Sequence, residues 1–311
     1  MQRILQPGEI EALDAIDFPR IRLPRPAELY AERAARLRQL ADGHPIADYL
    51  RFVALLADGQ AAAAATVKTT PPDAAVLQRA TEHGMPPLPT QDEPDPAWRE
   101  VLAQIVERAL AAGDTLPAPL REQLQRLRTM DAAALDTLAV DLLDEDVDAD
   151  TAALQPVVMA ALQVVWADRA SRLDAQALGV PAEPTTCPVC GTPPVASVLR
   201  IGGAAGGHRY LHCGLCATEW HMVRVKCSHC ESTAGVRFLG VEDGGKTVLA
   251  ETCSACHSYR KQVDQHQDPL AEPLADDLAS LRLDLLMAET EFERASGNPL
   301  LALPEGEPES E

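Results

Sequence analysis

Eight cysteines stand in four C-x-x-C pairs in the second half of this 311-residue chain. The pairs are Cys187/Cys190, Cys213/Cys216, Cys227/Cys230 and Cys253/Cys256. A C-x-x-C turn can point two thiolates at one ion, and two such turns supply the four sulfurs of a closed tetrahedral site. Because every cysteine belongs to a pair, the pattern favours metal binding, and zinc and iron are the metals that accept four thiolates.

The cysteine pattern is duplicated along the chain. The gaps between successive pairs are 22, 10 and 22 residues, so one C-x2-C-x22-C-x2-C unit recurs after 40 residues. The intervening residues also align: "VASVLRIGG" matches "GVRFLGVED", and "GHRYLHC" matches "TVLAETC". Each unit is typical of a short strand, a turn and a returning strand. We therefore predict two metal sites, the first formed by Cys187, Cys190, Cys213 and Cys216 and the second by Cys227, Cys230, Cys253 and Cys256.

Three alternatives use the same cysteines. A cross-braced fold would combine the first pair with the third and the second pair with the fourth, and spacing alone does not exclude it. A thioredoxin-like disulfide would need one C-x-x-C pair at a strand-to-helix junction. An iron–sulfur cluster would also use four thiolates. The regular duplication favours one ion per unit over all three.

Histidines in the same region are not needed as ligands. They are His208, His212, His221, His229 and His257. With four thiolates per site, we expect them at the surface or hydrogen-bonded to sulfur and carbonyl groups. A closed four-cysteine site leaves no position to activate water, and no nucleophile with an adjacent base stands out elsewhere. The sequence therefore predicts no enzymatic activity and no catalytic residues.

The residues before the cysteines predict a helical domain. Between Pro24 and about Leu173 apolar residues recur with helical spacing, and Pro and Gly separate the helices. Helices are predicted from Pro26 to a stop at Gly43, around Ile46–Ala57, and over Asp73–His83, Ala97–Ala112, Pro119–Met130 and Ala132–Leu143. The segment after Thr151 is apolar nearly all round, which predicts the most buried helix of the domain.

One acidic segment imitates a calcium loop. Asp144, Asp146 and Asp148 match its first three ligand positions, but the sixth position is Ala149 and the twelfth is Gln155. A calcium loop has glycine and a bidentate glutamate there. We therefore predict an acidic loop before a helix N-terminus, where carboxylates favour the positive end of the dipole.

Helical spacing returns after about residue 265. Five apolar residues fall on one face of a predicted helix that packs on the N-terminal helices: Leu274, Leu278, Leu281, Leu285 and Ala288. The last residues, "PEGEPESE", predict a disordered acidic tail. The predicted fold is α+β and multidomain, with a helical domain (1–180), two rubredoxin-like or zinc-ribbon-like hairpin modules (181–224 and 225–265), and a C-terminal helix with the tail (266–311).

Charge and hydropathy limit the partners. The formal net charge is −20, which argues against nucleic-acid phosphate as a partner. Residues 187–264 hold eight Lys and Arg against six Asp and Glu, a balance of +2, so the remainder carries −22. The longest apolar run, Pro156–Ala167, is shorter than the roughly 20 residues of a membrane span. The start, "MQRILQPGEI", has no apolar or twin-arginine leader, so we expect a cytoplasmic protein.

The residues around the cysteines resemble a known family. "CPVCGTPPVAS", "RYLHCGLCATEWHMVRVKC" and "ETCSACHSYRK" are similar to the metal-binding region of the FdhE family of formate dehydrogenase accessory proteins. The resemblance extends to "LYAERAARLRQLADGHPIADYLRFVALLA" and "DDLASLRLDLLMAETEFERASGNPLL", so it covers most of the chain. It implies rubredoxin-like modules on a helical domain, two metal ions per chain with iron favoured over zinc, and a non-enzymatic role. It also implies binding to the catalytic subunit of a respiratory, molybdenum-dependent formate dehydrogenase in the cytoplasm, before twin-arginine export.

One departure from a rubredoxin-like pattern concerns the residue after each cysteine pair. Gly191 follows the first pair and readily adopts a positive φ. Ala217, Glu231 and His257 follow the other pairs. The first site is therefore expected to be the closer to that pattern.

The segment "ATEWHMVRVK" is predicted to be a strap that fixes the two centres relative to each other. Its Trp220, His221 and Arg224 are the predicted partner surface, because Trp and Arg often anchor interfaces; the alternative for Trp220 is packing between the modules.

Two other functions stay open. A thiol oxidoreductase would need a metal-free C-x-x-C pair. A zinc-ribbon nucleic-acid module is suggested by five basic residues: Arg200, Arg209, Arg224, Lys226 and Arg237.

Overall fold

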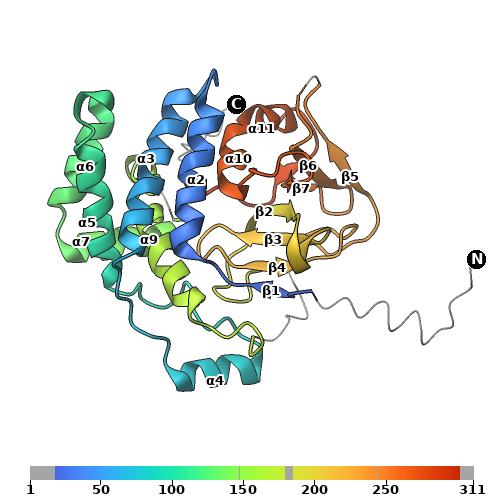
Figure 1. Ribbon diagram of the computed structural model, residues 1–311, viewed down its shortest axis with the longest axis horizontal. Coiled ribbons are helices and arrows are strands. Elements are labelled where there is room, and N and C mark those ends of the chain that lie inside the picture. Colours follow the sequence, from blue (N-terminus) through green and yellow to red (C-terminus); the bar gives the residue numbers. More distant parts are fainter. Residues whose placement is uncertain (1–17, 147, 179–184, 243, 302–311) are drawn as a thin grey trace, which may run out of the picture.

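The computed structural model describes residues 18–146, 148–178, 185–242 and 244–301. A helical part and a sheet part lie side by side (Figure 1). Residues 1–17 and 302–311, about which the sequence makes predictions, fall outside the described residues.

The helical part follows the apolar spacing. Its helices are α2 (Pro26–Ala41), α3 (Ala47–Ala64), α4 (Ala74–His83), α5 (Ala97–Leu110), α6 (Ala118–Thr129), α7 (Ala132–Leu143), α8 (Ala149–Ala152) and α9 (Gln155–Ser171). Pro26 opens α2 at a position where its missing N–H costs nothing. Asp73 and Asp131 cap α4 and α7 by accepting from backbone N–H groups. The acidic loop also ends in a cap, because Asp148 accepts from Thr151 N at 2.8 Å at the start of α8.

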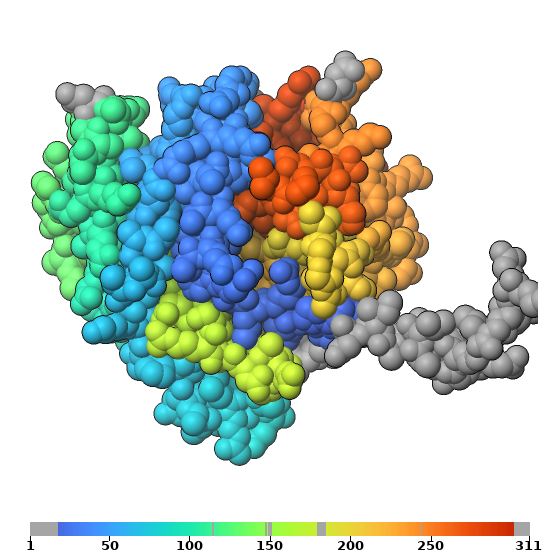
Figure 2. Space-filling view, in the orientation of Figure 1, coloured from blue at the N-terminus to red at the C-terminus, as the bar shows by residue number. Residues whose placement is uncertain are grey.

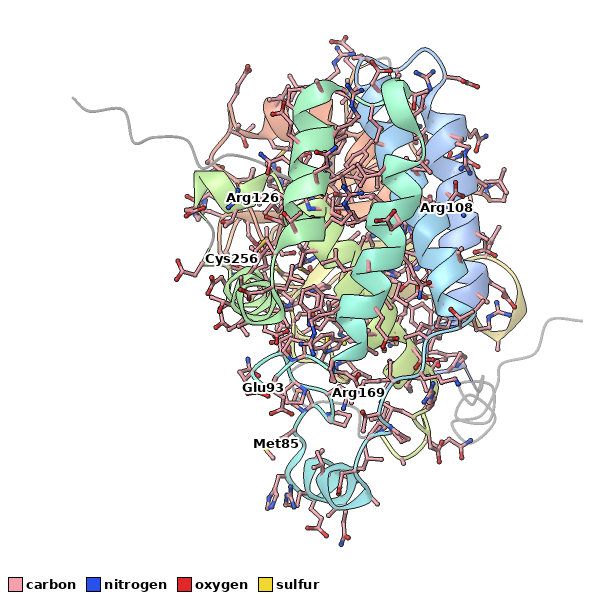
Figure 3. All side chains as sticks on the ribbon, turned by 90° about the vertical axis from the view of Figure 1, so that its left-hand side faces the viewer. Met85, Glu93, Arg108, Arg126, Arg169 and Cys256 are labelled. Carbon is pink, nitrogen blue, oxygen red and sulfur yellow. The ribbon has the colours of Figure 1, made fainter. Side chains whose placement is uncertain are left out.

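Helix α9 is the buried centre of this part, as predicted. Thirteen of its 17 residues are buried, so no face of it is left to solvent. Helices α2, α3, α5 and α7 all contact it. The outer helices are amphipathic instead: Arg108 on α5 and Arg126 on α6 are exposed and lie on outward-facing sides (Figure 3).

One sheet runs through both cysteine modules. Its order is β1 (Ile21–Arg22), β4 (Glu219–His221), β3 (Arg209–Cys213), β2 (Pro194–Leu199), β7 (Ser258–Asp264), β6 (Val248–Cys253) and β5 (Val236–Leu239), and β8 (Glu293–Arg294) pairs with β7. The antiparallel hairpins β2–β3 and β5–β6 are those predicted from the duplicated sequence. Each module adds a third strand, β4 or β7, directly after its second cysteine pair; β4 falls in the predicted strap segment, and β7 was not predicted.

The two modules are joined through strands that are distant in sequence. β2 pairs with β7 in parallel, with Val198 opposite Val263. Across this joint, Arg209 Nη2 donates to Glu251 Oε1 at 2.6 Å, and both side chains are buried. The predicted strap begins with β4, and its carbonyls at Val223 and Lys226 accept from Arg209 Nη1 at 3.0 and 2.8 Å. The pairing of β2 with β7 joins the modules as well.

The main apolar core continues from the helices into the first module. It includes residues of α2, α3, α5, α9 and β2 together with all four cysteines of the first unit. A separate small cluster, formed by Ala250, Tyr259, Leu283 and Met287, lies against the second module. The first module therefore shares the core of the helical part, whereas the second has little core of its own.

The C-terminal segment packs back on the helical part, as predicted. Helix α10 (Pro273–Ala279) lies against α2, where Leu274 and Leu278 are fully buried. Arg36 Nη2 of α2 donates to Asp276 Oδ1 at 2.6 Å across this contact. Figure 2 shows the surfaces of α2 and α10 in direct contact.

The single apolar face predicted for this segment is wrong beyond Ser280. The backbone leaves helical geometry there, and the Ser280 hydroxyl bonds back to carbonyls of α10. The following helix, α11 (Leu281–Met287), therefore has a different register. Leu283 and Met287 are buried against the second module, and Leu285 is 71% exposed.

Candidate metal centres

All four C-x-x-C turns share one backbone conformation. The residue after each pair has a positive φ between 52° and 82°: Gly191, Ala217, Glu231 and His257. Three of these residues are not glycine, and a left-handed conformation costs such a residue roughly 1 kcal/mol. Ala217, Glu231 and His257 therefore adopt the same turn as Gly191, although they are not glycine.

The sulfurs of the first unit converge on one point. Cys187 Sγ lies 3.5 Å from Cys216 Sγ, and Cys190 Sγ lies 3.4 Å from Cys213 Sγ. All four sulfurs lie within 4.8 Å of one another. The two C-x-x-C turns at the ends of one hairpin thus form one four-sulfur group, which we call the first group.

The second unit repeats this geometry. Cys227 Sγ lies 3.8 Å from Cys256 Sγ, and Cys230 Sγ lies 3.7 Å from Cys253 Sγ, again with all four within 4.8 Å. We call this the second group. The grouping of the cysteines is therefore sequential and not cross-braced.

Both groups have the dimensions of a tetrahedral metal site. Sulfurs bound to one ion at about 2.3 Å are about 3.8 Å apart, close to the sulfur–sulfur distances of both groups. Backbone N–H groups also point at the sulfurs, as Leu215 N does at Cys213 Sγ (3.4 Å) and His229 N at Cys227 Sγ (3.4 Å). Such donors favour thiolate over thiol. The residues present therefore fit a four-thiolate ion in each module.

Burial works against free thiolates in these groups. It raises the pKa of Cys187 well above its ordinary value and that of Cys227 to about 12. At Cys256 burial also raises the pKa, but hydrogen bonds with Ser258, Cys230 and Cys253 together outweigh it and lower the pKa to about 7. A bound cation would offset the cost of gathering four negative sulfurs, so metal binding and proton release are coupled.

Hydroxyl groups beside the sulfurs were missed in the sequence. A Ser or Thr stands two residues after each pair, and in three turns its oxygen contacts the second cysteine: Thr192 Oγ1 is 3.2 Å from Cys190 Sγ, Thr218 Oγ1 3.2 Å from Cys216 Sγ, and Ser258 Oγ 3.0 Å from Cys256 Sγ. In the fourth turn, the Ser232 hydroxyl bonds to Ala234 instead. The fourfold recurrence of C-x-x-C-x-(S/T) was the signal that could have revealed them.

The two groups differ most in exposure. Every cysteine of the first group is 0% exposed. In the second group, Cys227 and Cys253 are buried, Cys256 is half-buried and Cys230 is exposed. The first group is sealed within the protein, and the second opens to solvent.

The helical part seals the first group directly. Gln163, in the middle of α9, donates its Nε2 to Gly214 O at 2.7 Å, inside the second C-x-x-C turn. Leu88 N donates to Val189 O at 2.9 Å, inside the first turn. Buried polar groups from two remote segments therefore hold both turns of this group.

Comparisons with known proteins point to one family for all parts of the described chain. Family models described as FdhE N-terminal, FdhE central domain and FdhE C-terminal domain match residues 18–183, 186–224 and 225–301. A protein named FdhE homolog from Pseudomonas aeruginosa is 44% identical over 98% of this chain and 99% of its own length. The chain belongs to the FdhE family.

Other FdhE relatives give the same result. The FdhE homolog of Cronobacter sakazakii is 39% identical over 98% of this chain and 99% of its own length, and FdhE of Salmonella arizonae is 37% identical over 96% of each. The crystal structure of FdhE from Pseudomonas aeruginosa superposes with a TM-score of 0.79 at 38% identity, covering 91% of this chain and 99% of that one. The α+β architecture, with a helical part and a sheet that carries the cysteines, is thus that of FdhE.

Histidines lie outside both four-cysteine groups of this FdhE chain, as far as its described residues show. His212 is buried, and its Nδ1 lies 3.1 Å from Glu219 Oε1. Burial would raise the pKa of Glu219, but Arg200, His212 and Arg22 together hold it well below its usual range. These residues form a partly buried ion cluster on β1, β3 and β4, with Arg200 contributed from the position after β2.

The three predicted partner residues lie in different environments. Trp220 is 1% exposed, belongs to the main core and pairs with Ile21 of β1. It therefore packs neither between the modules nor at the surface. His221 is half-buried and Arg224 is exposed, with its guanidinium bonded to Gly207 O. The predicted partner surface is reduced to His221 and Arg224.

The basic residues that suggested nucleic-acid binding are mostly engaged within the fold. Their partners are Glu219 for Arg200, Glu251 for Arg209, the Gly207 carbonyl for Arg224 and Glu231 for Lys226. A thiol oxidoreductase is not favoured either, because every thiol belongs to a four-sulfur group. Among the described residues, no helix combines the length and apolarity needed to cross a membrane.

Proposed function

We propose that this chain is a cytoplasmic accessory protein needed to assemble an active respiratory formate dehydrogenase, and that it binds the molybdenum-dependent catalytic subunit before export. Membership of the FdhE family over residues 18–301 carries the proposal. We assign no catalytic residue, because four thiolates on one ion would leave no coordination position free to activate water.

Two metal ions per chain are part of the proposal. Cys187, Cys190, Cys213 and Cys216 hold one ion, and Cys227, Cys230, Cys253 and Cys256 hold the other. Iron is favoured by the family resemblance, and zinc suits the same donors. Bound iron would supply a one-electron couple, whereas zinc would supply a structural cross-link. His221 and Arg224, on the first module, are proposed as part of the partner surface.

Co-purification tests the protein-binding role. The tagged chain is produced with the formate dehydrogenase catalytic subunit in a host that lacks its own FdhE, and bound subunit and formate oxidation are both measured. Capture of the subunit and recovery of activity are expected. Failure of the wild-type chain in both measurements would refute the accessory role.

Elemental analysis tests the metal content independently. Protein purified from iron-supplemented medium should contain two metal ions per chain, with thiolate-to-iron absorption in the visible range where iron is bound. A Cys213→Ser/Cys216→Ser variant should lose one ion and a Cys253→Ser/Cys256→Ser variant the other. One ion or none in the wild-type chain contradicts the assignment.

A further inference from the structure

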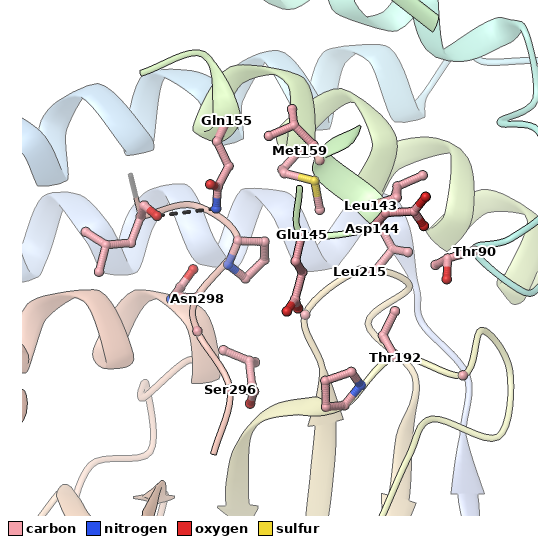
Figure 4. Close-up of a pocket in the computed structure, with 18 of the residues that line it drawn as sticks. Thr90, Leu143, Asp144, Glu145, Gln155, Met159, Thr192, Leu215, Ser296 and Asn298 are labelled. Atoms are coloured by element: carbon pink, nitrogen blue, oxygen red, sulfur yellow. Dashed lines mark hydrogen bonds between the residues drawn. The ribbon is translucent and has the colours of Figure 1, made fainter. Parts of the chain in front are cut away.

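A cleft lies beside the C-x-x-C turns of the first group, and none of its described lining residues is a cysteine. Its volume is about 600 Å3, and it lies between the helical part, the turns of the first group and the C-terminal segment (Figure 4). Its floor is apolar and buried, formed by side chains at most 8% exposed: Leu142, Met159, Val195, Leu215 and Leu301. Metal binding by the cysteines does not use this space.

The rim of the cleft is acidic. Asp144 and Glu145, in the loop after α7, are exposed, and their side chains form no hydrogen bond or ion pair with the described residues. Glu145 points into the cleft (Figure 4). A third carboxylate on the rim, Asp148, caps α8. The carboxylates of Asp144 and Glu145 are therefore available to a cationic ligand.

The rim holds no counter-charge for these carboxylates. Arg294 is the basic residue among the described lining residues, and it is already bound to Asp277 (2.5 Å) and Asp284 (3.4 Å). The chain also continues from Leu301, at the cleft, into ten residues that carry four glutamates and no Lys or Arg. Their charge has the same sign as the rim, so the sequence after Leu301 is not complementary to it.

Part of the cleft wall is formed by residues next to the cysteines of the first group. Residues 191–193 and 214–215 belong to its two C-x-x-C turns. Gly214 allows the C-terminal segment to approach closely, because a Cβ there would meet Pro299 Cδ and Cγ at 3.2 Å. Hydrogen bonds from Gln163 and Leu88 fix the two C-x-x-C turns that shape the cleft. A ligand would therefore bind to a preformed surface.

We propose that this cleft docks a segment of a partner protein in which an arginine or lysine is flanked by apolar side chains. The cationic group binds Asp144 and Glu145, and the apolar side chains cover the floor around Met159. That the occupant is a protein segment rests on the proposed function; the charge and polarity of the occupant rest on the cleft itself.

Fluorescence polarisation with defined peptides tests the cleft without the dehydrogenase. The probes are three labelled dodecapeptides, one of alternating Arg and Leu, one of alternating Glu and Leu, and one of alternating Arg and Ser. The full-length chain should bind the Arg/Leu peptide at least about tenfold more tightly than either of the others. An Asp144→Asn/Glu145→Gln variant should bind it about tenfold more weakly than wild type, because two rim charges are lost.

A matched variant separates the cleft from overall charge. Asp42→Asn/Glu82→Gln removes two exposed carboxylates elsewhere and should leave binding of the Arg/Leu peptide within about twofold of wild type. Equal binding by the two double variants, or no preference for the Arg/Leu peptide, overturns the proposal. So does a concentration-dependent dimer that only the Asp144→Asn/Glu145→Gln variant abolishes, because the occupant would then be a second copy of the chain.

The same variants keep this inference distinct from the proposed function. If wild type captures the dehydrogenase subunit and the cleft variant captures it equally well, the cleft is not the docking site for that partner. If wild type binds the Arg/Leu peptide but never captures the subunit, the accessory role fails and the binding chemistry of the cleft stands.

Discussion

The two four-cysteine groups should lose metal to a chelator at very different rates. The first group is 0% exposed at every cysteine, whereas Cys230 of the second is exposed and Cys256 half-buried. A chelator can reach the second ion through these two thiolates without unfolding. It can reach the first only after a C-x-x-C turn separates from the helical part.

The contacts of the first group set the size of the difference. Opening either turn breaks one hydrogen bond to the helical part, from Gln163 or Leu88, at a net cost of about 1 kcal/mol. It also exposes one buried apolar side chain, Leu215 or Val189, at about 2 kcal/mol. An opening cost of about 3 kcal/mol makes the open state roughly 100-fold rarer. The first ion should therefore leave at least about 100-fold more slowly than the second.

Chelator-induced release can be followed on protein loaded with two equivalents of zinc. We expect one equivalent in a fast phase and one in a slow phase, with Cys230 alkylated in the fast phase and Cys187 in the slow one. Gln163→Leu should accelerate the slow phase about fivefold and leave the fast phase unchanged. Gln78→Leu, at an exposed position of α4, is the matched control. Release of both equivalents at one rate, or early alkylation of Cys187, would refute the reasoning.

Three further predictions concern stability. Glu251→Gln should lower the free energy of unfolding, measured in urea, by about 3–5 kcal/mol, because it leaves the charge of Arg209 buried without its acidic partner. An Arg209→Met/Glu251→Met variant that is no more stable than Glu251→Gln would contradict this. Burial lowers the pKa of His221 to about 4, so the unfolded chain binds that proton more tightly, and stability falls as pH drops from about 6.5 towards 4. His221→Gln should remove this part of the fall, which thermal unfolding at pH 7 and pH 5 can measure. Gly191→Ala should destabilise by about 1 kcal/mol and Ala217→Gly should not, because both positions have a positive φ; equal shifts in melting temperature would argue against strain at these turns.

Much of the local structure follows from the sequence because it depends on neighbours along the chain. The helices α2 to α7 begin and end near the Pro, Asp and Gly residues that the sequence places there. The duplicated 40-residue spacing correctly predicts which cysteines meet, since each hairpin brings its own two turns together. At α11 the same approach is wrong, because one break at Ser280 changes which leucines are buried.

The sequence by itself determined that the eight cysteines form two repeated units and favoured one four-sulfur group in each; only the tertiary structure excluded the cross-braced pairing and decided how the groups differ. Cys187 and Cys227 occupy equivalent positions in units with the same cysteine spacing, so the spacing does not distinguish them. Burial depends on which remote surfaces meet: α9 and the Leu88 segment cover the first group, and nothing comparable in the described chain covers Cys230. The parallel pairing of β2 with β7, the burial of Trp220 against β1 and the cleft beside the first group arise in the same way, from contacts between segments far apart in sequence.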